Sequence, residues 1–425
     1  MAKCTICSKE DWQNVDEYTS QKHGMCICMT CGFVTYPEAI DNADKVTNYY
    51  KEEYRPAPTV PNVFSGQRKL HFHEAFLQQN LFKKWKKDDA PVVFESGAAI
   101  GLFLDYIKKN YPKAEVYGTE LTTTFRRVCW HQYKIKLDTE MDTSRKYDLI
   151  ASYKVAEHIP DVNTELEKYF ECLKDDGHLY ISVPCWFDQL TNFGMDKFSI
   201  QYYYHKNHVN VWTRKLFETL LTKHGFEIID QNHEYYDSTY LCKKNAGFKC
   251  KNPEYDSPVE IIETMRHIFE ANKAYEFGDY AKAIQIYPKF PMAHIGHYEH
   301  TRQKWHKLGL KGIEENIINP ALKALPNHSQ MHFFAGDLCS RYSDYEKAIG
   351  HFKKALDLKP NNPNCIDAIA NCFAAMAAKD PKHAKEYLPK AVEWTMRLNA
   401  VSFQHAHESV TKLFQYCAQI PMPGE

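Results

Sequence analysis

Four cysteines near the N-terminus have the spacing of metal ligands. They form two C-x-x-C pairs separated by twenty residues, namely Cys4, Cys7, Cys28 and Cys31. Two thiolates at this spacing chelate one tetrahedral Zn²⁺ ion, and a second pair completes its coordination. Because four protein ligands leave no open position, such an ion is structural. A redox-active thiol pair is the alternative. Cys26 could also replace Cys28, although the Cys31-Gly32 turn favours Cys28.

A second segment with possible chemistry runs from Pro91 to Leu121 and reads as strand, glycine turn, helix, strand and acid. Val92–Phe94 is a short apolar run that suits a strand buried on both faces. Glu120 follows the second strand, and in open α/β sheets an acidic residue at this position accepts hydrogen bonds from the ribose hydroxyls of the ligand. The turn between them is neither G-x-G-x-x-G nor a phosphate-gripping G-K-[ST]. The segment therefore favours S-adenosylmethionine over NAD or ATP.

Histidines and tyrosines that could move a proton concentrate in Gln201–Thr213, the densest such cluster in the chain. The cluster contains Tyr204 and His208 and precedes an expected helix. A further histidine, His158, follows the strand expected at Tyr147–Ser152. Methyl transfer to a hydroxyl or a carbon acid needs a base, most often a histidine. His208, His158 and Tyr204 are therefore candidate catalytic residues. The alternative is that His208 only lines the pocket or hydrogen-bonds to the start of the helix.

These residues carry a resemblance to the class I S-adenosylmethionine-dependent methyltransferases. The turn from Glu95 to Gly101 resembles their acid-x-G-x-G-x-G motif, with Ala99 in place of the central glycine. An alanine is tolerable there at negative φ and harmful if the turn needs positive φ. Tyr147–Asp161 is similar to the signature that follows the fourth strand of that fold. The resemblance spans roughly Pro91–Asp230 and implies an α/β Rossmann-like core. The implied cofactor-binding residues are Glu95, Gly97, Ala99, Gly101, Glu120 and, on the adenine, Asp138.

The cysteine segment and the His/Tyr cluster resemble features of the sugar C-methyltransferase-like families. There a zinc ribbon, a linker helix and a class I core follow one another, and Asn48–Arg55 resembles that linker. Their His/Tyr motif reads YHEHxxYFS, and a tyrosine and a histidine in it have acid/base roles. His208 matches the last histidine, Tyr204 matches with a one-residue slip, and Asn207 replaces the usual glutamate. The resemblance implies a sugar, nucleotide-sugar or glycan acceptor, methylated on a hydroxyl or a carbon.

The C-terminal third of the chain has a purely helical pattern. Small, aromatic and proline residues recur at the positions of a tetratricopeptide unit of about 34 residues, namely Gly336, Ala348, Phe352, Ala355 and Pro360. Gly278–Ile284 repeats the inter-helix turn, and Ala384–Ala391 echoes it again. Such repeats share a continuous core and present a concave face, usually to a protein partner. The sequence therefore predicts a solenoid for partner binding or self-association.

Length and composition bound these interpretations. The 425 residues suffice for several domains. The patterns predict a zinc ribbon at 1–50, a helical linker at 51–90, the methyltransferase core at 91–250 and tetratricopeptide-like repeats at 258–425. A formal net charge of −1 gives no global electrostatic footprint for nucleic acid. There is no run of transmembrane length and no signal-peptide pattern at the N-terminus, and fourteen cysteines favour metal or free thiols, so a cytoplasmic location is expected.

Three functions compete at this point. The first is a zinc-containing methyltransferase of sugars or glycans. The second is a protein or RNA methyltransferase that docks its substrate on the ribbon and the solenoid. RNA would require a basic face, and finding the basic run Lys83–Lys87 beside the pocket mouth would favour RNA, whereas the alternative for this run is a solvated helix face. The third is a scaffold with a degenerate fold, suggested by Ala99 and the misaligned His/Tyr motif. Binding of the cofactor separates the third from the first two.

Overall fold

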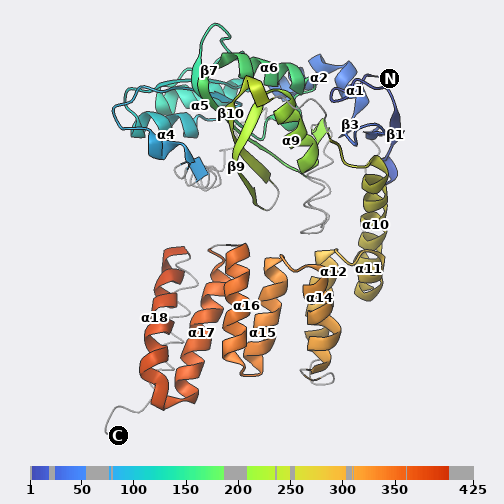
Figure 1. Cartoon of the computed structure of the whole chain (residues 1–425), viewed down its shortest axis with the longest axis vertical. Coiled ribbons are helices and arrows are strands. Elements are labelled where there is room, and N and C mark those ends of the chain that lie inside the picture. Colours follow the sequence, from blue (N-terminus) through green and yellow to red (C-terminus); the bar gives the residue numbers. More distant parts are fainter. Residues whose placement is uncertain are drawn as a thin grey trace. The chain divides into compact units, whose positions relative to one another are not determined.

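The computed structural model of the chain describes residues 2–18, 24–53, 76–77, 80–185, 208–234, 237–248, 254–302, 309, 311–359 and 361–401. They fall into two compact units (Figure 1). Most of the chain up to Phe269 forms the first unit, and the residues from Glu270 onward form the second. None of the helices in the described part of the chain combines the length and the apolar character that crossing a membrane requires.

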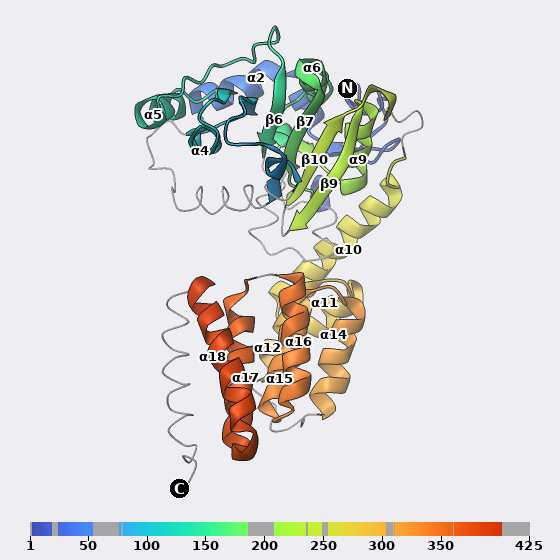
Figure 2. The same cartoon turned by 60° about the vertical axis from the view of Figure 1, so that its left-hand side comes forward.

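The first unit is built on a six-stranded sheet in the order β5-β4-β6-β7-β10-β9, of which Figure 2 labels β6, β7, β10 and β9. Its strands are β4 Val92–Ser96, β5 Glu115–Thr119, β6 Tyr147–Tyr153, β7 Leu173–Val183, β9 Phe226–Glu234 and β10 Asp237–Lys244. Strands β5, β4, β6 and β7 are parallel, whereas β10 is antiparallel to both β7 and β9. The predicted α/β architecture is confirmed, with a mixed sheet. Strand β10 was not predicted; it follows β9 after a short connection, and such a hairpin is necessarily antiparallel.

Helices connect and follow these strands. They are α4 Leu102–Asn110, α5 Thr123–Tyr133, α6 Val162–Cys172 and α9 Arg214–Lys223, and short turns occur at η3 Phe82–Lys84, η4 Ala156–His158 and η5 Ala246–Phe248. Two helices begin at side-chain caps, in which Asp161 accepts the N–H of Thr164 and Thr213 accepts the N–H of Leu216. Each cap satisfies a backbone donor that the first helical turn leaves unpaired.

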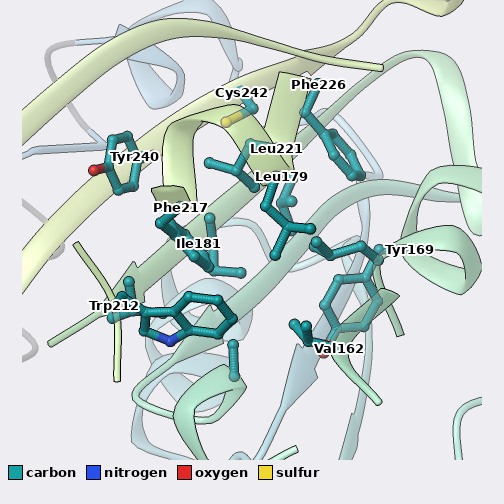
Figure 3. Packing of buried hydrophobic residues seen from close by; sticks show 14 of the residues in the cluster. Val162, Tyr169, Leu179, Ile181, Trp212, Phe217, Leu221, Phe226, Tyr240 and Cys242 are labelled. Carbon is teal, nitrogen blue, oxygen red and sulfur yellow. The ribbon is translucent and has the colours of Figure 1, made fainter. Parts of the chain in front are cut away.

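Alternating side chains of the sheet fill two separate cores. Phe94 and Ile150 belong to one core, in which Phe217 of α9 is also buried (Figure 3). Their neighbours Val93 and Leu149 belong to the other. Because successive strand residues point to opposite faces, both faces of the sheet are covered. Full burial of an apolar side chain of this size contributes about 1.5–3 kcal/mol.

The cysteine segment forms a small antiparallel sheet in the order β1-β2-β3-β8. Its strands are β1 Trp12–Asn14, β2 Cys26–Cys28, β3 Val34–Thr35 and β8 Asn210–Val211. The turn η1 Asp16–Tyr18 and the short helices α1 Pro37–Asp41, α2 Ala43–Asn48 and η2 Tyr49–Glu53 complete this part of the unit. Strand β8 comes from a remote part of the chain, and Thr35 Oγ1 also donates to the carbonyl of Val209. The sheet thus ties the cysteines to the residues directly after His208.

The second unit is helical, as predicted. Its elements are α10 Pro258–Glu276, which begins in the first unit, α11 Tyr280–Ile286, α12 Pro291–Arg302, η6 Glu314–Ile318, α14 Asn319–Ala324, α15 Ser329–Arg341, α16 Tyr345–Leu358, α17 Pro363–Lys379, η7 Pro381–His383 and α18 Ala384–Val401. Sequential helices from α15 to α18 pack against one another. A Cβ atom on Gly336 would lie 2.6 Å from Cε1 of Phe352, so the glycine allows α15 and α16 to approach closely.

Two inter-helix turns of this unit share one geometry. Gly278 and Ser343 both have positive φ angles, of 76° and 63°. An aspartate follows each of them and caps the next helix, Asp279 accepting the N–H of Lys282 and Asp344 that of Lys347. Pro360, the proline expected to end one repeat, lies outside the described residues.

Candidate functional site

The turn that follows β4 has a strongly left-handed backbone. Gly97, Ala99 and Gly101 have φ angles of 64°, 48° and 79°. The two glycines are also sterically required, because a Cβ atom would lie 2.5 Å from Cγ2 of Val155 at Gly97 and 2.3 Å from Sγ of Cys129 at Gly101. Ala99 therefore has the positive φ angle at which an alanine was expected to be unfavourable. A left-handed conformation costs a non-glycine residue about 1–2 kcal/mol.

Glu120, at the carboxyl end of β5, ties this turn together. Its Oε2 accepts the N–H of Ala99 at 3.0 Å, and its Oε1 accepts the N–H of Thr122 at 2.7 Å. The N–H of Glu120 donates to the carbonyl of Asp138 at 2.9 Å. The carboxylate of Asp138 is exposed and lies 3.5 Å from Nζ of Lys136. Glu120 and Asp138 thus lie side by side, and their binding of the cofactor stays a prediction.

Glu95 places a buried carboxyl group at the start of the turn. Its Oε2 is buried and meets no hydrogen-bond partner in the described part of the chain. Burial, and secondarily the charge of Glu120, raises the pKa of Glu95 to about 8. A buried oxygen without a partner suits a cationic or hydrogen-bonding ligand group. The three features of the turn, its glycines, Glu120 and Glu95, therefore fit a nucleoside that also carries a positive charge.

A second group of side chains gathers after β6. Glu157, His158 and His208 each offer a ligand or base atom, and these atoms all lie within 4.8 Å of one another. The imidazole rings of the two histidines are 4.9 Å apart between centroids. Glu157 is fully buried and His208 is 8% exposed. The two histidines, proposed from separate parts of the sequence, thus form one cluster, whereas Tyr204 lies outside the described residues.

Tyr50 completes this cluster and was missed as a functional residue. Its Oη lies 2.6 Å from Nδ1 of His158. The sequence placed Tyr50 only in the linker after the cysteines. A half-buried tyrosine in a short helix has no distinguishing spacing, so the sequence holds no signal that would have selected it. Glu157 belongs to the same cluster, and its Oε1 lies 3.9 Å from Nε2 of His158.

Hydrogen bonds from a side chain to the backbone hold the cluster of Glu157, His158 and His208 in place. The side-chain amide of Asn210 donates to the carbonyls of Ala156 and Ile159, each at 2.7 Å. These bonds clamp η4, which carries Glu157 and His158, to β8, which follows His208. Lys154 at the start of the loop has a φ of 56° and pairs with Asp237 at 3.0 Å.

The two groups lie against each other at the carboxyl ends of adjacent parallel strands. Ser96, the last residue of β4, pairs with Ser152 of β6. The side chain of Val155, in the loop before His158, occupies the space left by the missing Cβ of Gly97. Thr122 Oγ1, beside Glu120, donates to the carbonyl of Tyr50 at 3.4 Å. This edge of the sheet is where open α/β folds bind their ligands.

The four predicted zinc ligands form one cluster. Their sulfur atoms all lie within 4.8 Å of one another, with 3.6 Å between Cys4 and Cys31 and 3.5 Å between Cys7 and Cys28. A tetrahedral site with Zn–S bonds of about 2.3 Å separates its sulfurs by about 3.8 Å, so the arrangement fits the ion. Cys26 is not in the cluster, and its thiol donates to the carbonyl of Gly24.

The two C-x-x-C turns are alike although their sequences differ. The residue after each pair, Ser8 or Gly32, has a positive φ, of 62° or 73°. Each donates its N–H to the carbonyl of the first cysteine of its pair, at 2.8 Å and 2.9 Å. Hydrogen bonds with Cys31 and Cys4 lower the pKa of Cys28, whereas the hydrogen bond with Cys28 raises the pKa of both partners. The thiolate is the form of cysteine that binds a metal.

A basic concavity of about 480 Å³ lies elsewhere on the first unit. Its lining residues are Asn80, Lys83, Lys84, Asp176, His178, Ile229 and Lys243. Burial first, and then the charges of Lys84 and Lys243, lower the pKa of His178. His178 pairs with Leu149, near the amino end of β6, whereas the candidate site follows the carboxyl ends. The basic run thus lies toward the opposite ends of the strands.

Comparison with known proteins agrees with this reading of the fold. Residues 67–231 match the family model of a methyltransferase domain. No curated protein matches the sequence. Among solved structures, magnesium protoporphyrin IX methyltransferase from Synechocystis with bound S-adenosylhomocysteine is 14% identical, with a TM-score of 0.36 over 48% of this chain and 100% of its own.

Two further solved structures have similar likenesses. The plantazolicin methyltransferase BpumL, in complex with a triazolic desmethylPZN analogue and S-adenosylhomocysteine, is 13% identical, with a TM-score of 0.35 over 49% of this chain and 94% of its own. A putative methyltransferase in complex with the Haloferax volcanii Trm112 methyltransferase activator is 10% identical, with a TM-score of 0.32 over 43% of this chain and 96% of the match.

Proposed function

We propose that this chain, an S-adenosylmethionine-dependent methyltransferase, methylates a hydroxyl or acidic carbon of a small polar acceptor. A sugar, nucleotide-sugar or glycan precursor is the class that its sequence resemblance favours. The observation that carries the proposal is the position of Glu157, His158 and His208. They lie within 4.8 Å of one another, next to the turn suited to the cofactor.

The cofactor half of the site would use the turn after β4 and the end of β5. Glu120 accepts one backbone N–H on each carboxylate oxygen. Because each oxygen has two lone pairs, capacity remains for the two ribose hydroxyls. Glu95 would face a cationic part of the ligand, and Gly97, Ala99 and Gly101 let the ligand approach the backbone. Asp138 would flank the adenine.

S-adenosylmethionine supplies a methyl group already activated as a sulfonium, so the protein has to align the acceptor and remove one proton. We assign acceptor activation to the cluster of Glu157, His158 and His208, with His208 as the primary candidate for the base. Tyr50 positions His158 through the bond at its Nδ1. Tyr204 is kept as a further candidate from the sequence.

The remaining parts receive supporting roles in this proposal. A structural Zn²⁺ ion bound by Cys4, Cys7, Cys28 and Cys31 would stabilise the small sheet that includes β8. The ribbon, linker, core and repeat boundaries are proposed as 1–50, 51–90, 91–250 and 258–425. The helical repeats, proposed to be tetratricopeptide-like, would bind a protein partner or a second copy of the chain. The similar turns at Gly278 and Ser343 support a repeating unit.

The competing functions have less support. RNA methylation would require positive charge at the site, but Lys83 and Lys84 line a concavity toward the other ends of the strands. A non-catalytic scaffold would not need the buried carboxyl group of Glu95 beside an acid that already orders the turn, since an uncompensated buried acid costs stability.

Calorimetric titration of the zinc-loaded full chain with S-adenosylhomocysteine tests the proposal. We expect saturable binding and at least a tenfold loss of affinity in Glu120→Ala. Glu120→Gln keeps one acceptor oxygen and should lose less, and Glu140→Ala, which removes an exposed carboxylate in the same region, should bind normally. A nucleotide-sugar panel with labelled methyl donor then identifies the acceptor. No binding at millimolar ligand, in protein that is folded by circular dichroism, would refute the methyltransferase site.

A further inference from the structure

We infer that Glu157, His158 and His208 bind a divalent first-row transition-metal cation, which holds and activates the acceptor. The inference rests on the proposed function for its catalytic meaning, but the cation site itself can be tested without the cofactor. In this arrangement the two histidines are metal ligands. The cation, in place of a histidine base, makes the acceptor hydroxyl easier to deprotonate.

The spacing of the three side chains suits a shared ion. Their ligand atoms lie within 4.8 Å of one another, and Nε2 of His158 is 3.9 Å from Oε1 of Glu157. Bonds of about 2.1 Å place two ligand atoms at most about 4.2 Å apart. Small side-chain rotations are therefore enough to close the three atoms around one cation.

The donor set defines the kind of metal. Two imidazoles and one carboxylate favour Mn²⁺, Fe²⁺, Co²⁺ or Zn²⁺ and leave open coordination positions. This set differs from the four thiolates near the N-terminus, which select a soft ion and leave no position open. Glu157 is also fully buried. A cation held by the two histidines would stabilise the ionised form of this carboxyl group.

Tyr50 occupies the place of a second-shell partner for this site. Ligating histidines commonly donate their other ring N–H to an oxygen, which fixes the tautomer and the ring orientation. When Nδ1–H of His158 donates to Tyr50 Oη at 2.6 Å, the lone pair of Nε2 remains on the side of Glu157. Asn210 adds rigidity, because it bonds the carbonyls of Ala156 and Ile159 on either side of the two ligands.

The open positions give the cation a defined role. A bound acceptor hydroxyl would lose its proton to water more readily, because the cation stabilises the alkoxide. The new O–C bond then forms as the C–S bond of the sulfonium breaks, leaving neutral S-adenosylhomocysteine. Two coordinated oxygens of one acceptor would also fix its orientation. The chemical class favoured is therefore an acceptor with neighbouring oxygens, as in a vicinal diol.

Titration of the full chain with Mn²⁺, followed by the loss of the free-ion electron paramagnetic resonance signal, tests the site. Mn²⁺ is a suitable probe because its preference for oxygen and nitrogen ligands keeps it off the four thiolates. We expect one Mn²⁺ per chain and at least a tenfold loss of affinity in His208→Ala and in Glu157→Gln. His131→Ala removes an exposed histidine of the same unit and should bind as the wild type does. Tyr50→Phe should weaken binding by about tenfold.

The melting temperature and the zinc content of each variant are measured as controls. A variant that keeps both is folded, so a loss of Mn²⁺ binding in it reports on the site. No Mn²⁺ binding at millimolar concentration, or unchanged binding in both His208→Ala and Glu157→Gln, would overturn the inference. Titration of the same preparations with S-adenosylhomocysteine separates the two proposals. Cofactor binding without Mn²⁺ binding would sink the cation and leave His208 as a base, whereas Mn²⁺ binding without cofactor binding would support the cation and sink the methyltransferase site.

Discussion

The two halves of the candidate site are built in opposite ways. The half proposed to bind the cofactor, called the cofactor half, is local, since Glu95, the glycine turn and Glu120 lie within one strand-helix-strand segment. The acceptor half brings together Tyr50, the pair Glu157 and His158, and His208, which are far apart in the sequence. A local half is encoded by one motif, whereas a dispersed half depends on everything that holds its segments together.

The cysteine segment is a main part of what holds the acceptor half. Its sheet includes β8 directly after His208, and Thr35 bonds the carbonyl of Val209. The segment is also bound to the core elsewhere, because Lys223 Nζ donates to the carbonyl of Ile6 at 3.1 Å and Asn163 donates to that of Thr5. Cys4, Cys28 and Cys31 belong to the same buried cluster as the sheet residues. The small sheet is therefore part of the site's construction.

Loss of the cysteine site should produce the largest effect and should separate the two halves. For Cys31→Ser, or after chelation of the zinc ion proposed for this site, we expect the free energy of unfolding to fall on the order of 5 kcal/mol or more, since metal binding is coupled to folding. Thermal denaturation measures this loss. At low temperature, where the six-stranded sheet stays folded, binding of S-adenosylhomocysteine should survive while methyl transfer is lost.

Cys26→Ser is the matched control, because Cys26 lies outside the four-sulfur cluster. It should leave stability and transfer close to those of the wild type. Equal loss of cofactor binding and transfer in Cys31→Ser, at a temperature where circular dichroism still reports a folded sheet, would contradict the division into a local and a dispersed half.

This division also explains what the sequence could predict. Strands β4 and β5 and the acid at Glu120 follow from apolar runs, glycines and spacing, which are local signals. The two-residue strand β8 has no periodicity, and its pairing with β3 is a tertiary event. His158 and His208 were recognised as residue types, but their meeting depends on the contacts of Asn210. Strand β10 was missed although it spans eight residues, and its place between β7 and β9 in the sheet is also a tertiary event.

The buried acid of the cofactor half predicts a pH dependence of intermediate size. Glu95 has a folded-state pKa of about 8 against an ordinary value of 4.5, because burial and then Glu120 disfavour its ionised form. The folded state therefore holds a proton that the unfolded state releases. The free energy of unfolding should fall as pH rises through this window, by up to about 1.4 kcal/mol per pH unit from this group.

Glu95→Gln removes that titration. Urea denaturation at a series of pH values should give similar stabilities for the two proteins near pH 5 and a more stable variant, by a few kcal/mol, above pH 8. The variant should bind S-adenosylhomocysteine more weakly, since its amide, unlike the carboxyl group, cannot lose a proton to compensate the ammonium group of the ligand. Parallel stability curves across the whole range would contradict the buried, protonated state of Glu95.

The smallest expected effect concerns the departure at Ala99, where the local half conflicts with its own backbone. Ala99→Gly should relieve the left-handed strain of about 1–2 kcal/mol but should add about 0.5–1 kcal/mol of unfolded-state entropy. The net gain in the free energy of unfolding is thus between about 0 and about 1.5 kcal/mol, measurable by urea denaturation. Ala98→Gly is the matched control, since Ala98 is not among the residues with positive φ and should lose about 0.5–1 kcal/mol. Opposite signs for the two neighbours would place the strain at one residue, and equal losses would refute it. The backbone N–H of residue 99, which donates to Glu120, is kept in Ala99→Gly. The substitution should therefore change the affinity for S-adenosylhomocysteine less than any substitution of Glu120 itself.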